Sequence, residues 1–339
     1  MNNFLIVRLG SLGDVVHGIP VAAALRQEFP SARIDWMVDP HYVELLNLVE
    51  GIDRRVPVDP RAIKKGPGRQ RFRETLKELR RADYDAVIDL QGLLKSAMLA
   101  RSVRGRRTIG FPRKHLREKL ARVFYTHAPD LGDATHVIYR NLALLAPLTV
   151  ADRRVRFPIE IPHTPTIAQV VTRFAPDGFV LINPGAAWPN KQWPPERFGE
   201  VAAGIQRDLG WRSLVLWGPG EQDLAHRVAA ASGGAADASP PTTITDLVGI
   251  ARHARLMISG DTGPLHIAAA VGAPIVALYG PTRPDRNGPW SLDDISVSRV
   301  HRCSCQYERA CRKAERCIDD IGVAEVMNAV HRRLGAREP

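Results

Sequence analysis

The stretch from Leu256 to Thr282, LMISGDTGPLHIAAAVGAPIVALYGPT, constrains the fold more than any other part of the chain. Leu256 to Ile258 is an apolar run of strand length, and Ser259 to Gly263 interrupts it with small residues that permit a tight turn. A helix then begins near Pro264, and Ala273 to Tyr279 has the pattern of a second buried strand. A strand, a turn, a helix and a strand in this order indicate a parallel βαβ unit.

The turn of this unit predicts an anion site. A helix that begins at the carboxyl end of a parallel strand presents backbone N–H groups and a partial positive charge, for which phosphate is the usual ligand. We expect Asp261 or Thr262 to cap this helix, and a neutral His266 to hydrogen-bond a sugar or phosphate oxygen. A purely structural interpretation, with both residues only capping and His266 a satisfied polar residue, fits the stretch equally well.

The rest of the chain repeats the alternation of strand and helix. It runs through residues 1–155, pauses at the proline-rich stretch 156–165, and resumes over 166–322. We therefore predict an α/β protein of two doubly wound, Rossmann-like domains joined by a linker, with a cleft between their facing carboxyl edges. Residues 323–339 form a C-terminal helix and tail that can pack on either domain.

The charge is strongly basic and unevenly distributed. Lys and Arg total 47 against 36 Asp and Glu, a formal net charge of +11. The excess is concentrated in Arg61–Asp83 and Arg101–Arg122, which indicates an anionic partner for the N-terminal half: nucleic acid, an anionic membrane surface or a phosphorylated substrate. A basic face without a ligand is the structural alternative. The N-terminus has no signal-peptide pattern and no apolar run is long enough to span a bilayer, so we expect a cytoplasmic protein.

Polar residues follow several predicted strands. Asp14, at the end of the first strand, is a candidate general base for an acceptor hydroxyl, although an ordinary N-cap role is a strong alternative. Lys191 follows the first strand of the second domain and suits the neutralisation of a pyrophosphate, and Glu221 follows the next strand, where acidic residues commonly bind ribose. The glycines Gly10 and Gly13 do not form the GxGxxG pattern, which weakens a dinucleotide site.

Six motifs spread over both domains resemble glycosyltransferase family 9, most closely its lipopolysaccharide heptosyltransferase I type. They are VRLGSLGDVVHGIP (7–20), IDWMVD (34–39), YDAVIDLQGLLKSA (84–97), NPGAAWPNKQWP (183–194), WGPGE (217–221) and SGDTGPLHIAAAVGAPIVALYGPT (259–282). The resemblance implies a GT-B fold and an inverting, metal-independent transfer of L-glycero-D-manno-heptose from ADP-heptose to a Kdo residue of lipid A.

The resemblance also implies roles for single residues. Asp14 would deprotonate the Kdo hydroxyl, Lys191 with the Thr262 and Gly263 amides would hold the pyrophosphate, Glu221 would bind the ribose, and Asp261 and His266 would contact the heptose. A peripheral position at the cytoplasmic face of the inner membrane would bring the acceptor within reach. The basic residues expected to grip its phosphates and carboxylates are Arg61, Lys64, Lys95, Arg113 and Arg117.

Two features depart from the family pattern. Ala186 and Ala187 stand where members often carry a hydroxyl residue after NPG, so backbone or water must replace that phosphate contact. All four cysteines lie near the C-terminus, at Cys303, Cys305, Cys311 and Cys317. In a reducing compartment this clustering favours a structural, tetrahedral Zn or Fe site over disulfides, with thiols that bind no metal as the alternative.

Three other functions compete with this interpretation. One is another family 9 transferase, either heptosyltransferase II or III or an enzyme that modifies a protein. A second is a basic nucleic-acid-binding protein, which the sequence supports with neither a helix-turn-helix nor an aromatic RNA platform. A third is a carbohydrate-binding relative without catalytic activity, in which Asp14 would be dispensable.

Overall fold

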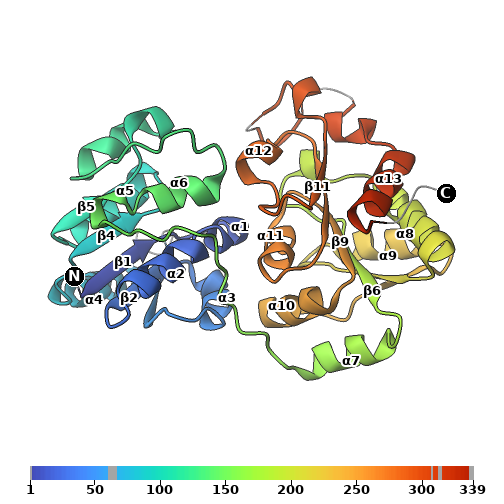
Figure 1. Cartoon of the computed structure of the whole chain (residues 1–339), viewed down its shortest axis with the longest axis horizontal. Helices are drawn as coiled ribbons and strands as arrows, with labels where there is room; N and C mark the ends of the chain where they lie inside the picture. The colour runs from blue at the N-terminus through green and yellow to red at the C-terminus, as the bar shows by residue number, and fades with distance from the viewer. Residues whose placement is uncertain (1, 60–66, 307, 312–314, 336–339) are drawn as a thin grey trace. The chain divides into compact units, whose positions relative to one another are not determined.

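The computed structural model describes residues 2–59, 67–306, 308–311 and 315–335. The chain divides into two compact units, Met1–Glu160 and Ile161–Pro339, and the division falls inside the stretch expected to be the linker. Each unit is a parallel sheet with helices on both faces, so the predicted class of two Rossmann-like α/β units is confirmed (Figure 1). The cleft between them stays a prediction. No helix in the described ranges has the length and apolar character needed to cross a bilayer.

The sheet of the first unit has the strand order β3-β2-β1-β4-β5, and all its pairs are parallel. The chain therefore moves outward from β1 in one direction and then returns to add β4 and β5 on the other side. This reversal places the turns after β1 and β4 next to each other. The strands are β1 Asn3–Val7, β2 Arg33–Val38, β3 Arg54–Pro57, β4 Ala86–Asp89 and β5 Arg107–Ile109.

Two stretches of the first unit differ from the prediction. The sequence pattern from Val15 to Phe29 predicts a single helix. The chain instead turns at His17 and Gly18 and forms two helices, because Pro20 lacks an N–H and Gly18 lies against the Trp36 ring. The basic, glycine-rich sequence of Arg61–Arg73 predicts a loop. Its described part is helical from Pro67, since Phe72 and Leu76 pack with Leu79 on the core. The helices are α1 Leu12–Val16, α2 Ile19–Glu28, η1 Pro40–Tyr42, α3 Val43–Asn47, α4 Pro67–Arg81, α5 Leu94–Ser102, η3 Arg113–His115, η4 Lys119–Phe124, α6 Val137–Ala143 and η5 Ala146–Leu148.

The sheet of the second unit has the order β11-β10-β9-β6-β7-β8, again with parallel pairs only. Its chain reversal lies between β6 and β9. In doubly wound sheets a ligand binds at the carboxyl edge beside such a reversal, so this edge is the place to look for a site. The strands are β6 Phe179–Asn183, β7 Arg212–Val215, β8 Ala236–Ala238, β9 Leu256–Gly260, β10 Ile275–Tyr279 and β11 Ile295–Ser298.

Two groups of helices cover this second sheet. In one, α8 packs against α9 and α13 over a core that includes Phe198 and Val330; in the other, α10 packs against α7 and α11. The C-terminal helix α13 thus belongs to the second unit, which resolves an alternative that the sequence left open. The helices are α7 Pro165–Arg173, η6 Pro189–Lys191, α8 Pro195–Leu209, α9 Gln222–Ala231, α10 Ile244–His253, α11 Gly263–Ala270, α12 Pro284–Asn287, η7 Val300–Arg302, η8 Cys317–Asp320 and α13 Val323–Arg333.

Candidate functional site

The turns after β6 and β9 are joined by one buried side chain. Asn183, the last residue of β6, lies with its amide nitrogen 3.0 Å from the Ser259 hydroxyl, 3.2 Å from the Thr262 hydroxyl and 3.0 Å from the Gly185 carbonyl. Because amide and hydroxyl groups in a buried position must find partners, these contacts lock the two turns in register. We had not predicted this role of Asn183; the only signal in the sequence is a polar residue at the end of a buried strand.

Asp261 is the centre of the site. Its side chain is only 5% exposed, and its two oxygens accept from Lys191 Nζ at 2.6 Å and from Asn287 Nδ2 at 2.8 Å, with His266 Nε2 at 3.2 Å. Burial works against ionisation, but the His266 hydrogen bond and the Lys191 charge outweigh it and hold the pKa of Asp261 well below its usual range. Asp261 is therefore an ionised anchor for groups from three segments.

Lys191 is held in place on two sides. Its ammonium lies 4.7 Å from the centre of the Trp188 ring as well as beside Asp261, and its side chain is 16% exposed. A lysine so restrained presents a fixed positive charge instead of a solvated, mobile one. The pyrophosphate role of Lys191 stays a prediction, and the structure places its ammonium against the carboxylate and the carbonyl of Asp261, the residue before Thr262.

The N-terminus of α11 has no side-chain cap, which corrects our expectation for Asp261 and Thr262. Thr262 occupies the N-cap position with extended backbone, but its side chain makes no cap hydrogen bond. The Thr262 hydroxyl contacts Asn183 and Ser259, while the Asp261 carboxylate is used by Lys191, His266 and Asn287. Since both candidate caps are engaged elsewhere, the helix N-terminus can accept an anionic ligand.

The turn after β7 joins the same edge through Glu221. The Glu221 carboxylate accepts from the Gly218 N–H at 3.1 Å and lies directly against Gly185 of the β6 turn, where a Cβ would come within 2.2 Å of Oε2. Glycine at this position of the NPG sequence is thus required by the approach of a carboxylate. The structure brings Glu221 to the turn that leads to Lys191, and its ribose role stays a prediction.

Asp14 lies at the carboxyl edge of the first unit, in α1. Its carboxylate accepts from the Ser11 N–H at 3.0 Å and the Ser11 hydroxyl at 2.9 Å, and it pairs with the buried Arg8 guanidinium. Asp14 is the third residue of the helix, and Ser11 is its N-cap. The Asp14 carboxylate therefore reaches back to Ser11 instead of capping the helix itself. Its side chain remains 39% exposed, which leaves the oriented carboxylate open to a substrate.

Residues that we had not predicted hold Asp14 and its turn. Arg8 anchors the carboxylate and also donates to the Leu90 carbonyl of the turn after β4. Gln91 accepts from the Leu9 N–H at 3.0 Å, and buried Asp89 accepts from the Gln91 N–H at 2.9 Å. The turns after β1 and β4 are therefore joined by hydrogen bonds. They meet because β1 and β4 are neighbours in the sheet, although they are far apart in the sequence.

Three of the five predicted acceptor residues lie in one region of the first unit. Lys95 is in the first turn of α5, Arg113 begins η3, and Arg117 follows it; all three are exposed. The Leu94 N–H donates to Glu118 at 2.6 Å, so the segments that carry Lys95 and Arg117 lie side by side. Arg61 and Lys64 fall outside the described residues.

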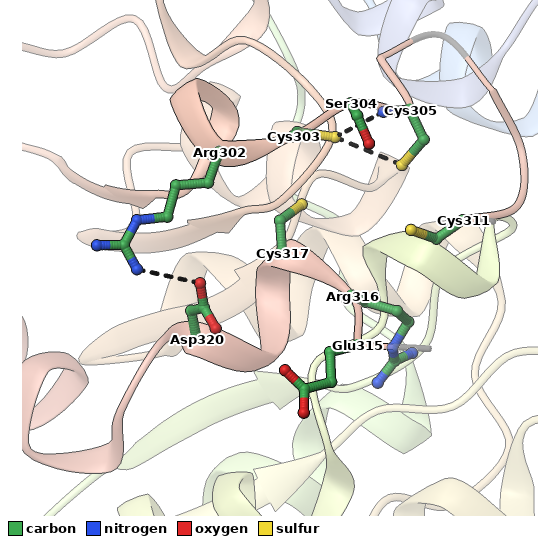
Figure 2. Close-up of a pocket in the computed structure, with 9 residues that line it drawn as sticks. All are labelled: Arg302, Cys303, Ser304, Cys305, Cys311, Glu315, Arg316, Cys317 and Asp320. Atoms are coloured by element: carbon green, nitrogen blue, oxygen red, sulfur yellow. Dashed lines mark hydrogen bonds and ion pairs between the residues drawn. The ribbon is translucent and has the colours of Figure 1, made fainter. Parts of the chain in front are cut away.

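The four cysteines line one pocket of the second unit, and none of them is in a disulfide (Figure 2); they are Cys303, Cys305, Cys311 and Cys317. The sulfurs of Cys303 and Cys305 are 3.4 Å apart, and Cys317 points toward Cys303. Within the described ranges, no three His, Cys, Asp or Glu side chains already stand in metal-binding geometry. The predicted metal is thus not tested by this arrangement.

Known proteins with the same architecture are similar over nearly the whole chain. The model of glycosyltransferase family 9 (heptosyltransferase) matches residues 72–317. Lipopolysaccharide heptosyltransferase 1 of Pseudomonas aeruginosa is 30% identical, covering 91% of this chain and 86% of that protein. The solved structure of E. coli heptosyltransferase WaaC with ADP has a TM-score of 0.75 at 26% identity, covering 91% of this chain and 96% of its own. The same enzyme with ADP-2-deoxy-2-fluoro heptose also has a TM-score of 0.75, at 25% identity, covering 97% and 99%.

Replacing Asp261 tests its role as the anchor of the site. Asp261→Asn leaves Lys191 and His266 without their charged partner, so we expect a loss of unfolding free energy of about 3 kcal/mol at neutral pH. Because the folded pKa of Asp261 is depressed, its contribution is complete above the ordinary Asp pKa of about 4 and declines as the pH falls toward the folded value. Urea unfolding from pH 8 to pH 3 measures this difference.

The exposed Asp223, at the start of α9, supplies the matched control. Asp223→Asn should stay within about 1 kcal/mol of the unmodified chain at every pH, because it removes only an exposed interaction with the α9 dipole. A difference for Asp261→Asn that stays constant down to pH 3, or that is absent at pH 7, contradicts the assignment of an ionised anchor.

Proposed function

Because the chain belongs to glycosyltransferase family 9 and is a glycosyltransferase, we propose that it transfers L-glycero-D-manno-heptose from ADP-heptose to a Kdo residue of lipid A in lipopolysaccharide core synthesis, with inversion and without a catalytic metal. The observation that carries the proposal is the set of turns after β6, β7 and β9, in which Lys191, Glu221 and the α11 N-terminus gather at one sheet edge. The similar WaaC enzyme was solved with ADP and an ADP-heptose analogue.

The donor binds through charge and backbone dipoles. The diphosphate lies at the α11 N-terminus, where the Thr262 and Gly263 amides donate to it and Lys191 neutralises it. Lys191 has three N–H donors and can keep Asp261 while it contacts phosphate. Glu221 accepts from the ribose hydroxyls, and His266 and Asp261 contact the heptose. The absent hydroxyl at Ala186 and Ala187 is replaced by backbone N–H groups or water.

Asp14 acts as the general base. Its carboxylate takes the proton of the Kdo hydroxyl while the hydroxyl oxygen attacks the anomeric carbon of the heptose. The bond from that carbon to the phosphate oxygen breaks, and ADP leaves with the electron pair. Lys191 and the α11 N-terminus stabilise the charge that develops on the diphosphate, so the protein supplies electrostatically what a divalent metal supplies in other transferases. Attack opposite the leaving group inverts the anomeric centre.

The acceptor is anionic and anchored in a lipid, and the surface of α5 and η4 fits both properties. Leu120 is 69% and Val123 73% exposed on η4, and Met98 is exposed on the adjacent α5. Exposed basic side chains lie on or next to the same two helices, and Arg101 and Arg104 line one pocket with Met98. The membrane-facing surface that we propose consists of Met98, Leu120 and Val123 with Lys95, Arg101, Arg104, Arg117 and Lys119. Apolar side chains within a basic rim are typical of peripheral proteins on anionic bilayers.

Two other functions are distinguished by substrate. A heptosyltransferase of type II or III, or one that modifies a protein, would use the same donor turns and differ only in the acceptor. A nucleic-acid-binding protein would explain the basic surface but not the turns after β6, β7 and β9. Incubation with ADP-heptose and Kdo2-lipid A separates these cases, because absence of transfer refutes the proposed acceptor.

The Asp14→Asn variant tests the mechanism in the same assay. Loss of the base should lower kcat by at least about a hundredfold, while the KM for ADP-heptose changes little because the proposed donor contacts all come from the second unit. Thermal stabilisation by ADP should persist, which shows that the variant is folded. Asp133→Asn, at an exposed position of the same unit, is the control. Unchanged turnover of Asp14→Asn removes Asp14 from the base role.

Glu221→Gln tests the donor turn. The neutral amide retains the shape of the carboxylate but loses charge-assisted bonds to ribose, so we expect the donor KM to rise by about tenfold with kcat little changed. Asp223→Asn, two residues along, should leave the KM unaltered. A variant whose KM for ADP-heptose equals that of the unmodified enzyme would exclude Glu221 from ribose binding.

Acidic substitutions on η4 test the membrane-facing surface. The double variant Leu120→Glu, Val123→Glu should bind vesicles of phosphatidylcholine and phosphatidylglycerol at least about tenfold more weakly, since two apolar insertions are lost and two negative charges added. Binding of the unmodified protein should fall as salt rises. Leu292→Glu, at a fully exposed leucine of the second unit, is the matched control. Equal sedimentation of the double variant and the control with vesicles would disprove the role of this surface.

A further inference from the structure

The cysteine pocket of the second unit is clamped to the turn that carries Lys191. Asn190, which is buried, donates to the Glu308 carbonyl at 3.0 Å and lies with its amide nitrogen 3.6 Å from Cys305 Sγ. Arg316, beside Cys317, donates to the Pro189 carbonyl at 2.8 Å. The segment around the cysteines thus holds the first two residues of η6, Pro189 and Asn190, and Lys191 is the third.

The neighbouring strand end closes the same clamp. Gly280, which follows β10, packs so tightly that an added Cβ would lie 2.9 Å from Ile318, 3.3 Å from the Asn190 carbonyl and 3.5 Å from Cys317 Sγ. Any movement of the cysteine segment is therefore transmitted to the backbone of the Asn190 turn. This coupling does not depend on the thiols being close to the donor.

Two of the four thiols are spaced as metal-bound thiolates are. Cys303 and Cys305 have their sulfurs 3.4 Å apart, close to the roughly 3.8 Å that two thiolates adopt on a tetrahedral ion with metal–sulfur bonds of about 2.3 Å. The Cys305 N–H points at Cys303 Sγ at 3.4 Å, and the Asn190 amide points at Cys305 Sγ. Such N–H···S contacts are the outer-shell donors that orient thiolate ligands. The Cys317 side chain points toward Cys303, and Cys311 lines the same pocket (Figure 2).

We propose that Cys303, Cys305, Cys311 and Cys317 bind one thiophilic divalent ion, Zn²⁺ or Fe²⁺, and that this ion fixes the Asn190 turn so that Lys191 is poised for the donor diphosphate. Binding displaces the thiol protons to solvent and leaves four thiolate–metal bonds. Cys311 moves toward the other three sulfurs as the ion binds. The ion is remote from the reacting atoms and structural, and the coupling to the donor rests on the proposed function.

Metal content is the first test. The full chain, expressed with supplemented Zn²⁺ or Fe²⁺ and purified without chelator, should carry about one ion per chain by elemental analysis. Co²⁺ added to the stripped protein should give the thiolate charge-transfer absorption of a tetrahedral site. Cys317→Ser should lower the ion content at least severalfold, while Ser304→Ala, in the same pocket, should retain it. A chain that binds neither native metal nor Co²⁺ with its thiols reduced overturns the site.

Coupling to Lys191 is tested separately. Asn190→Ala keeps all four thiols, so it should retain the ion but raise the ADP dissociation constant about fivefold, and stripping the ion from the unmodified chain should do the same. Unchanged ADP affinity in both cases overturns the coupling. If the ion binds but no heptose is transferred, the proposed function fails and the metal site stands. If heptose is transferred by a chain that binds no metal, the proposed function stands and the metal site fails.

Discussion

The buried carboxylate of Asp261 is the interaction on which the second unit's functional edge depends. An ionised group with a 5% exposed side chain is tolerated only with charged or hydrogen-bonding partners, and Asp261 draws these from distant segments: Lys191, His266 and Asn287. Satisfying one carboxylate therefore fixes the β6 turn, α11 and α12 at once. It also leaves the Lys191 ammonium fixed before any ligand arrives, so that the ordering cost of a long flexible side chain is met on folding and not on binding.

The longer elements were predictable because their patterns are local. Apolar runs predict strands at Arg33–Val38 and Phe179–Asn183, and a helical apolar pattern predicts a helix at Pro195–Leu209. The structure has all three elements with these bounds. The edge strands β3, β8 and β11 were missed, since three or four residues carry too little periodicity, and Arg54, Arg55 and Asp237 mask what remains. The helix break at His17 and Gly18 depends on the fit of Gly18 against Trp36, which no local pattern reveals.

The site shows the same division between local and non-local information. Polar residues after buried strands could be predicted, and Lys191, Glu221, Asp261 and Asp14 all lie where parallel strands end. The contacts that hold these turns together could not be predicted. Asn183 pairs with Ser259, and Arg8 with Leu90, across neighbouring strands that are far apart in the chain. The wrong expectation of a side-chain cap on α11 has the same origin: Asp261 and Thr262 are suitable caps locally, but non-local partners engage both.

Each unit has a turn between a strand and a helix at its carboxyl edge, and the two turns present groups of opposite charge. The contacts of the side chains at the start of each helix decide which charge is presented. After β1, Asp14 reaches back to the Ser11 N–H and hydroxyl and pairs with Arg8, so the turn presents an oriented carboxylate with a 39% exposed side chain. After β9, the possible caps are withdrawn into the Asp261 and Asn183 networks, so the α11 N-terminus presents its backbone N–H groups and a partial positive charge. An exposed carboxylate and a helix N-terminus without a side-chain cap therefore arise from the same backbone topology, because in one turn the acidic side chain faces outward and in the other it is buried.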